Sequence, residues 1–292
     1  MPKSLSRQLT FLPPPKIWES RFGPTLFRRI PTQPGVYLLG DGQGHVLYVG
    51  KAINLRRRLL SYKNLPLDRC SRKTARLIRQ TKAISWEILP TPEAALLREN
   101  ELLRLLKPKF NQLNTRPEHY GRIMLTISPT GALTLTWGRG HPPSQITAHW
   151  YGAFKGLRRL QVALQALLRL CIIITARPDS PHQLPHPAYA EKIPPTLPLP
   201  APLPPPLNSP QVWHDFFAGH NDLLLLQLES LLPPNLPLSL RRMAELDLKR
   251  LRTFYTAGPL RNQSLCQLAG LPGPWLAPEE LDDLLALEQA AR

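Results

Sequence analysis

The stretch PGVYLLGDGQGHVLYVGKAINLRRRLLSY, residues 34–62, decides the fold of the first part of this 292-residue chain. Two short apolar runs, 36–39 and 46–49, flank a glycine-containing segment at 41–44. β-Branched and aromatic residues around a glycine-rich loop of this length are typical of a β-hairpin. We therefore predict two antiparallel strands, each of which carries one tyrosine.

The sequence after this hairpin predicts a basic helix that begins at Asn54, a favourable N-cap residue, and ends near residue 63. At 3.6 residues per turn, two leucines and Tyr62 share one face of the helix, and Arg58 borders that face. A guanidinium held by packing can bind a phosphate through two hydrogen bonds, so Arg58 is a candidate phosphate ligand. The two arginines that precede it fit either a solvated basic face or contacts to a nucleic acid.

The net charge of +17 is concentrated in the first 180 residues. Residues 31–116 carry sixteen basic and six acidic side chains, whereas residues 181–292 carry eight basic and eleven acidic ones. Surface lysine and arginine release counterions from a nucleic-acid backbone, so this distribution favours a polyanionic partner. The alternative is that the charge only maintains solubility.

A second basic helix is predicted for residues 70–82, and the alternating pattern at 84–89 predicts a strand with one buried face. The charged side chains of this second helix would face either water or a nucleic-acid backbone. The candidate nucleic-acid contacts on the two basic helices are Arg56, Arg57, Lys63, Arg72, Lys73 and Arg76.

The segment 91–107 has the signals of a third helix, with Thr91 as the N-cap, a proline in the first turn and Pro108 after its end. On a helical wheel Glu99 projects from the middle of the apolar face. A buried carboxylate is costly unless something compensates for it. Three alternatives follow: an arginine pairs with Glu99, a metal binds it, or it titrates with a raised pKa.

Asn111 ends the short extended segment 107–111. An asparagine at such a position is most often a turn residue. If it is buried, its amide would orient another side chain or contact a phosphate.

Three cysteines, Cys70, Cys171 and Cys266, lie far apart and form no CxxC pair. This spacing indicates neither a zinc site nor a disulfide framework, and it fits a reducing cytoplasm. The N-terminal residues contain no long apolar run, and the later apolar stretches are too short to span a bilayer. We therefore expect a cytoplasmic protein that is not embedded in a membrane.

The composition changes several times along the chain. Proline makes up thirteen of the 33 residues at 178–210, which predicts an extended linker with little core. The leucine-rich segments beyond it predict short amphipathic helices that serve as a packing or partner module. The predicted parts are an irregular N-terminal arm at 1–30, pinned by its aromatic residues, an α+β domain at 31–116, a small α+β region at 117–177, a Pro-rich linker at 178–210 and a helical region at 211–292.

Three motifs in the predicted domain carry a family resemblance: PGVY at 34–37, YVGKAINLRRRL at 48–59 and ALLRENELLRLLKPKFN at 95–111. Together they resemble the GIY-YIG nuclease domain. They are most similar to the N-terminal nuclease of the bacterial excision-repair protein UvrC and of its short homologue Cho. The resemblance covers about residues 34–111 and weakens outside them.

The resemblance implies a small mixed sheet with flanking helices, in which the two tyrosines of the hairpin lie on neighbouring strands. It assigns the family's single metal-binding glutamate to Glu99, the residue that the helical wheel also selects. Glu99 would hold one Mg²⁺ or Mn²⁺, whose other ligands are waters and phosphate oxygens. The residues that this resemblance and the patterns above suggest for catalysis are Tyr37, Tyr48, Lys51, Arg58, Tyr62, Glu99 and Asn111.

The implied chemistry is phosphodiester hydrolysis, in which Arg58 clamps the scissile phosphate and a tyrosine acts as the general base on water. Tyr48 is the first candidate for this base and Tyr37 is the alternative. A phenol has a pKa of about 10 and needs positive charge nearby to act near neutral pH. Lys51, Arg58 and the metal are the expected sources of that charge.

The implied task is incision on the 3′ side of a lesion in damaged DNA during nucleotide excision repair, with UvrA and UvrB as loading proteins. One alternative is a structure-specific or recombination nuclease of the same family. A second alternative is a DNA-binding scaffold with an inactive nuclease fold. The presence of the whole candidate set argues against this scaffold, because an inactive copy has no reason to keep it.

Overall fold

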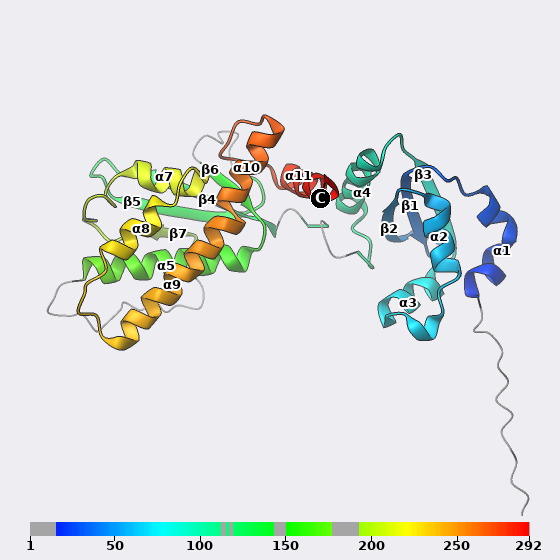
Figure 1. The fold of residues 1–292 in the computed structure, drawn as a ribbon, viewed down its shortest axis with the longest axis horizontal. Coiled ribbons are helices and arrows are strands. Elements are labelled where there is room, and N and C mark those ends of the chain that lie inside the picture. Colours follow the sequence, from blue (N-terminus) through cyan, green and yellow to red (C-terminus); the bar gives the residue numbers. More distant parts are fainter. Residues whose placement is uncertain (1–15, 112–114, 117–118, 143–149, 177–192, 292) are drawn as a thin grey trace, which may run out of the picture. The chain divides into compact units, whose positions relative to one another are not determined.

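The computed structural model describes residues 16–111, 115–116, 119–142, 150–176 and 193–291. The chain divides into two compact units, residues 1–115 and 116–292, and each is described by itself (Figure 1). The α+β class predicted from the sequence is confirmed. No helix in these described ranges is long and apolar enough to cross a membrane.

The N-terminal unit is built on a three-stranded antiparallel sheet. Its strands are β1 (Gly35–Gly40), β2 (Val46–Ala52) and β3 (Ala83–Ile88), in the order β2-β1-β3. The predicted hairpin is therefore present, and Tyr37 pairs with Gly50 across it. Because β1 lies in the centre, β2 is an edge strand, and its outward-facing backbone groups need partners from outside the sheet.

Helices cover both faces of this sheet. The helices are α1 (Ile17–Arg29), α2 (Leu55–Lys63), α3 (Arg72–Gln80) and α4 (Pro92–Leu106), and a 3-10 turn, η1, spans Leu67–Arg69. The N-caps predicted for α2 and α4 are confirmed, because Asn54 accepts from the backbone N–H of Arg57 and Thr91 accepts from that of Ala94. One face packs against α4 through Val36, Val49, Ala95, Leu102 and Leu103. The opposite face packs against α1, α2 and α3 through Trp18, Tyr37, Leu39, Leu55, Leu59 and Ile78.

The N-terminal arm differs from the predicted irregular segment, because α1 forms two helical pieces around a kink at Gly23. The buried Trp18 indole donates to the carbonyl of Ile78 over 3.1 Å. Arg21 donates to the carbonyl of Arg79 over 3.1 Å and also to that of Thr81. The helix that the sequence pattern missed is thus stabilised by contacts distant in the sequence, which fasten it to the end of α3.

The C-terminal unit contains a second antiparallel sheet. Its strands are β4 (Gly121–Ile127), β5 (Leu133–Arg139), β6 (Trp150–Phe154) and β7 (Thr196–Pro198), in the order β6-β4-β5-β7. Strands β4 and β5 form a hairpin within the α+β region predicted at 117–177. Its turn is closed by Ser128, whose carbonyl accepts from the backbone N–H of Gly131 over 2.9 Å and whose N–H donates to the carbonyl of Ala132 over 2.9 Å.

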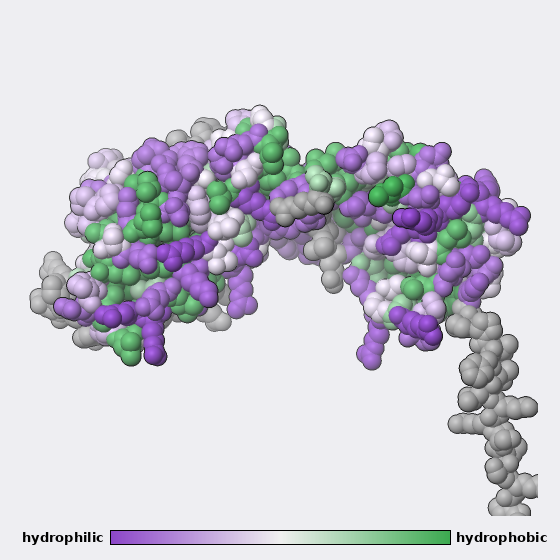
Figure 2. Space-filling view, viewed as in Figure 1, coloured by the Kyte–Doolittle hydropathy of each residue, from purple (hydrophilic) through white to green (hydrophobic). Residues whose placement is uncertain are grey.

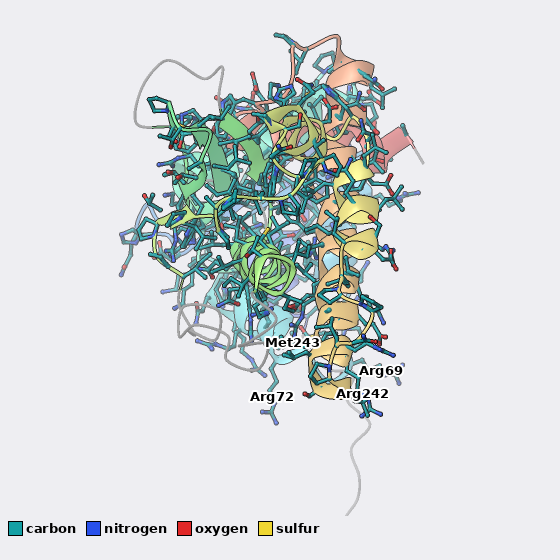
Figure 3. All side chains as sticks on the ribbon, turned by 90° about the vertical axis from the view of Figure 1, so that its left-hand side faces the viewer. Arg69, Arg72, Arg242 and Met243 are labelled. Carbon is teal, nitrogen blue, oxygen red and sulfur yellow. The ribbon has the colours of Figure 1, made fainter. Side chains whose placement is uncertain are left out.

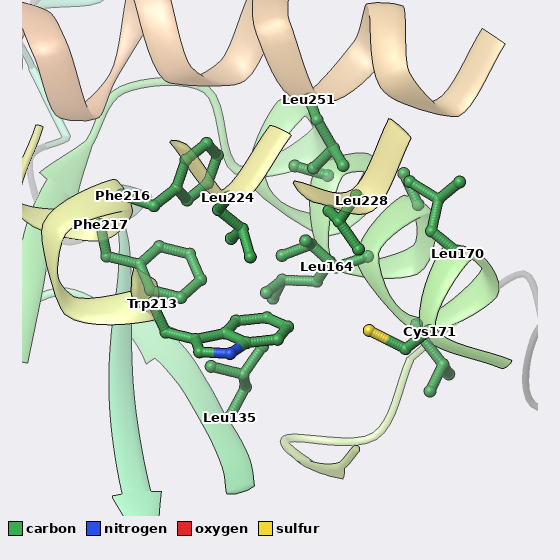
Figure 4. Close-up of a cluster of buried hydrophobic side chains, with 14 of the residues drawn as sticks. Leu135, Leu164, Leu170, Cys171, Trp213, Phe216, Phe217, Leu224, Leu228 and Leu251 are labelled. Carbon is green, nitrogen blue, oxygen red and sulfur yellow. The ribbon is translucent and has the colours of Figure 1, made fainter. Parts of the chain in front are cut away.

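Six helices accompany this sheet among the described residues. They are α5 (Leu157–Thr175), α7 (Pro210–Ala218), α8 (Leu223–Ser230), α9 (Leu238–Ala257), α10 (Pro259–Ala269) and α11 (Pro278–Ala291). Trp213, Phe216 and Phe217 of α7 point toward leucines of α5, α8 and α9 and form one buried cluster with Leu135 of β5 (Figure 4). The sheet and helices on both sides of the proline-rich segment therefore share one core.

The predicted linker at 178–210 differs from the structure over its second half. Residues 178–192 lie outside the described residues, but β7 pairs with β5, and Leu197, Leu199, Leu203 and Leu207 are buried in the shared core. Proline is tolerated here because β7 is an edge strand, where one face of the backbone needs no ladder partner. The leucines between the prolines pack into the core, and the high proline content alone did not predict this packing.

A buried ion pair joins α5 to α9. Arg169 donates from Nε and Nη2 to the two carboxylate oxygens of Asp247, each over 2.6 Å, and Asp247 is fully buried. We expect Asp247→Ala to lower the free energy of unfolding of this unit by about 3–5 kcal/mol, because it removes the carboxylate that compensates the buried Arg169 guanidinium. Urea unfolding followed by circular dichroism measures the change.

The matched control replaces both partners, as Arg169→Met with Asp247→Leu. Apolar residues of similar volume remove the two charges together, so most of the lost stability should return. A double variant as unstable as the single one would contradict this account of the pair.

Candidate active site

The outer edge of β2 is saturated by the segment that follows α4. Phe110 donates its backbone N–H to the carbonyl of Leu47 over 3.0 Å. The side-chain amide of Asn111 accepts from the backbone N–H of Val49 over 3.0 Å and donates to its carbonyl over 2.9 Å. The Asn111 side chain thus forms the two hydrogen bonds that a neighbouring strand would form with Val49. This role is more specific than the turn role expected for an asparagine at this position.

Glu99 of α4 satisfies the next outward group of the same strand. Its Oε1 accepts from the backbone N–H of Lys51 over 3.2 Å, and its Oε2 lies 3.2 Å from the Lys51 ammonium. The carboxylate is 15% exposed, as expected for an acid that projects from an apolar helix face. The sequence left three alternatives for Glu99, and the observed contact is an ion pair. Its cation is Lys51 of β2 rather than an arginine.

Arg58, Tyr37 and Tyr62 form a hydrogen-bonded cluster on the α2 side of the sheet. Arg58 Nε donates to the hydroxyl of Tyr37 over 3.1 Å, and Arg58 Nη2 donates to that of Tyr62 over 3.3 Å. The two hydroxyls lie 3.2 Å apart, and the guanidinium carbon lies 5.0 Å from the centre of the Tyr62 ring. These contacts agree with the prediction that Arg58 is held in place. The groups that hold it include the hydroxyls of Tyr37 and Tyr62.

Gly50 makes room for this cluster and was missed by the sequence reasoning. A Cβ at this position would lie 2.5 Å from both Cζ and the hydroxyl oxygen of Tyr37. Gly50 is the cross-strand partner of Tyr37, so the tyrosine ring lies directly over the glycine backbone. The available signal was a glycine two residues after Tyr48, at the end of a predicted strand.

Tyr48 lies between the phenol cluster and Glu99. Its ring centre is 6.0 Å from that of Tyr37, and its side chain is half-buried. Burial, followed by the proximity of Tyr62 and Glu99, raises the pKa of Tyr48 to about 12, and Arg58 offsets only part of this shift.

Tyr37 is fully buried, and this burial, together with the neighbouring phenols, holds its pKa well above the ordinary value. Both tyrosines of the hairpin are therefore protonated near neutral pH. Of the three expected sources of positive charge, Arg58 offsets only part of these shifts and Lys51 is paired with Glu99. The third source, the metal, stays a prediction.

A groove of about 300 Å³ runs beside Arg58 at the start of α2. Arg57 and Ser61 line it together with Ile53, whose side chain is 69% exposed at the turn between β2 and α2. Arg57 was a candidate nucleic-acid contact, and the groove gives it a surface shared with the phosphate-binding candidate Arg58.

Two other candidate nucleic-acid contacts, Arg56 and Lys63, also have structural roles. Arg56 donates to the carbonyls of Ile30 and Arg28 over 2.7 and 3.0 Å, and Lys63 forms an ion pair with Glu19 at 3.1 Å. Both side chains fasten α1 and the residue after it to α2. Both side chains therefore have a structural role, and their nucleic-acid contacts stay predictions.

The remaining candidates, Arg72, Lys73 and Arg76, are exposed on α3. Arg72 extends away from the ribbon (Figure 3), and hydrophilic side chains cover much of the visible surface around α1 and α3 (Figure 2). Exposure is compatible with a nucleic-acid contact and equally with a solvated face, so these three remain predictions.

The comparison with known families decides how this arrangement is classified. The family model described as the UvrC-like GIY-YIG domain matches residues 33–112. Residues 33–112 form a UvrC-like GIY-YIG domain. The match includes the three strands, α2, α3, α4 and Asn111, so every catalytic candidate lies inside the GIY-YIG domain.

Curated relatives of the GIY-YIG domain bear the name UvrABC system protein C. The protein of Legionella pneumophila (strain Paris) is 32% identical over 146 residues, which cover 49% of this chain and 23% of the relative. That of Koribacter versatilis is 40% identical over 100 residues, 34% of this chain and 16% of the relative. The chain therefore spans less than a quarter of the length of these relatives.

Among solved structures, the chain is similar to the GIY-YIG N-terminal endonuclease domain of UvrC from Thermotoga maritima, described as bound to its catalytic divalent cation, magnesium. The identity is 27% and the TM-score is 0.27. The matched part covers 30% of this chain and 93% of that domain.

The close approach at Gly50 gives a testable expectation for the GIY-YIG domain. Gly50→Ala should displace the Tyr37 ring from its contacts with Arg58 and lower the free energy of unfolding by about 1–3 kcal/mol, the usual cost of overpacking. Urea unfolding of the full chain measures this loss.

Gly40→Ala on the neighbouring strand is the matched control. Its added Cβ would meet no atom closer than the carbonyl oxygen of His45 at 3.3 Å, so a smaller loss is expected. Equal losses in the two variants would show that the Tyr37 contact is not the cause.

Proposed function

We propose that the chain is a metal-dependent DNA endonuclease of the UvrC and Cho type, which incises damaged DNA on the 3′ side of a lesion during nucleotide excision repair. One observation carries the proposal: phenols, a guanidinium and a carboxylate from both sides of the sheet converge around edge strand β2. These are the groups that phosphodiester hydrolysis needs, and they lie within a UvrC-like GIY-YIG domain.

Arg58 is proposed to clamp the scissile phosphate. Its hydrogen bonds to Tyr37 and Tyr62 occupy Nε and Nη2, and Nη1 has no hydrogen bond within the described residues. A guanidinium fixed in this way loses little side-chain entropy when it binds a phosphate oxygen. Arg57 lines the same groove and would contact a neighbouring phosphate of the strand.

The chemistry of the carboxylate fits a divalent cation at Glu99. One of its oxygens already faces an ammonium group at 3.2 Å, and the side chain is partly exposed, so a cation can approach from solvent. Glu99 would hold Mg²⁺ or Mn²⁺ together with waters and substrate phosphate oxygens, an arrangement common for ions bound by one carboxylate. Such an ion supplies positive charge that neutralises the phosphate and lowers the pKa of nearby water.

Tyr48 is proposed as the general base, because it is less buried than Tyr37 and the charge of Glu99 acts on its pKa. Tyr37, the alternative from the sequence, has its hydroxyl engaged with Arg58 and Tyr62. We therefore propose that Tyr37 and Tyr62 position the phosphate clamp. Asn111 would fix the strand from which Tyr48 projects.

Glu99→Gln should reduce the nicking rate by at least about 100-fold, since loss of a catalytic cation removes several kcal/mol of transition-state stabilisation. DNA affinity should change little, because the arginines of the groove are untouched. Nicking of a labelled duplex and fluorescence anisotropy measure the two quantities. Glu93→Gln, on the polar side of α4, is the control, and retained nicking by Glu99→Gln would refute the metal assignment.

Tyr48→Phe should lower the rate by about 10²–10⁴-fold, the usual contribution of a general base. A phenol with a pKa of about 12 is protonated at neutral pH, so its basic fraction grows as pH rises. The wild-type rate should therefore increase from about pH 6 to pH 9, and Tyr48→Phe should lose this dependence. A larger loss of rate in Tyr37→Phe than in Tyr48→Phe would exchange the two roles.

The substrate is tested with three DNA molecules in the presence of Mg²⁺ or Mn²⁺: plain plasmid, branched duplex, and a duplex with one bulky adduct loaded by UvrA and UvrB. Cutting of the loaded adduct duplex on the 3′ side supports the proposed function. Cutting of branched DNA alone would assign the enzyme to structure-specific cleavage, and no cutting of any substrate would indicate a scaffold. Binding should weaken steeply with salt if phosphate contacts dominate.

A further inference from the structure

A cluster of metal-ligating side chains lies in the C-terminal unit, at the end of α7. His214 and Asp215 belong to this helix, and His220 follows Gly219, which ends it in the left-handed conformation. One ligand atom from each of the three side chains lies within 4.8 Å of the others. The GIY-YIG domain and its proposed site contribute no residue to this cluster.

We propose that His214, Asp215 and His220 bind a divalent transition-metal ion, with Zn²⁺ as the best match. Two imidazoles and one carboxylate are borderline ligands that suit zinc, whereas magnesium and calcium prefer sites composed of oxygen. Three protein ligands leave a fourth position of a tetrahedral ion for water. His220 is exposed, which gives the ion a path from solvent.

The orientation of His214 is fixed before any metal binds. Its Nδ1 lies 2.8 Å from the hydroxyl of Tyr151 on β6, and the two rings pack edge to face with centres 5.6 Å apart. This bond engages Nδ1, so the proposal assigns the ligand role to Nε2. A hydrogen bond on the second ring nitrogen is the usual companion of a metal-bound histidine.

Asp215 lies at the end of α7, and its carboxylate contacts the side chains of Gln211, His220 and Asn221. Gln211 donates over 2.8 Å, whereas the distances to His220 and Asn221 are 3.3 and 3.4 Å. Gln211 and His220 both contact Oδ1, whereas Oδ2 is contacted by Asn221 at 3.4 Å, so Oδ2 is the less engaged oxygen among the described contacts.

The same hydrogen bonds offer a purely structural explanation, namely that Asp215 secures the turn between α7 and α8. That explanation accounts for His220 and Asn221 but not for His214, whose ring is held in the same cluster by Tyr151 and packs 5.7 Å from the His220 ring. A bound metal accounts for all three side chains and for the Tyr151 contact.

The test uses the full chain, stripped with a chelator and dialysed, with excess Mg²⁺ present to occupy oxygen-rich sites. Zinc titration by calorimetry, with metal content measured by mass spectrometry, should give one zinc ion per chain. His220→Asn and His214→Asn should each abolish this stoichiometric binding. His220→Asn alters an exposed side chain, so a loss of binding with an unchanged circular dichroism spectrum is independent of folding.

His141→Asn is the matched control, because within the described part of the chain His141 pairs with a single carboxylate, that of Glu279 at 3.1 Å. It should retain the zinc ion. Tyr151→Phe should weaken zinc affinity by about 10–100-fold through the loss of the bond to His214. The proposal is overturned if the wild-type chain takes up no stoichiometric zinc, or if His214→Asn and His220→Asn bind zinc as the wild type does.

Discussion

The arrangement of the candidate active site depends on the need to satisfy the outward backbone groups of an edge strand. The backbone N–H and C=O groups of Leu47, Val49 and Lys51 in β2 point away from β1. An edge of this kind, if left unpaired, is open to water and to other chains. The segment after α4 covers it with one backbone group and the amide of Asn111, and α4 adds the carboxylate of Glu99. The same contacts that close the sheet therefore bring the acid of α4 to the phenols of the hairpin.

Charge in this site is arranged so that the phenols remain neutral until another positive charge arrives. Burial raises the pKa of Tyr48 and Tyr37, and the nearby cation Lys51 is already paired with Glu99. Arg58 is held by two hydroxyls, which is compatible with protonated phenols and gives the guanidinium a fixed direction. In the proposed mechanism, a cation recruited together with DNA would thus act on Tyr48 and on the phosphate in the same event.

The C-terminal unit shows how local composition can conceal a core. Proline dominates the segment before α7, yet the leucines between the prolines enter a cluster built by α5, α7, α8 and α9. Its arrangement also brings His214 to Tyr151 on a distant strand, and such a contact between residues 63 positions apart leaves no periodic trace in the sequence. The unit is accordingly more than a helical appendage to the GIY-YIG domain.

The sequence by itself determined the hairpin, the capped helices and the selection of Glu99, because turn chemistry, N-caps and helical periodicity are local properties. It also supplied the motifs that resemble a GIY-YIG domain. Only the tertiary structure decided that Lys51 pairs with Glu99, that Asn111 caps β2, that Gly50 admits Tyr37, and that Arg56 and Lys63 fasten α1. Each of these features depends on which groups distant in the sequence come into contact. The packing of the chain sets those distances.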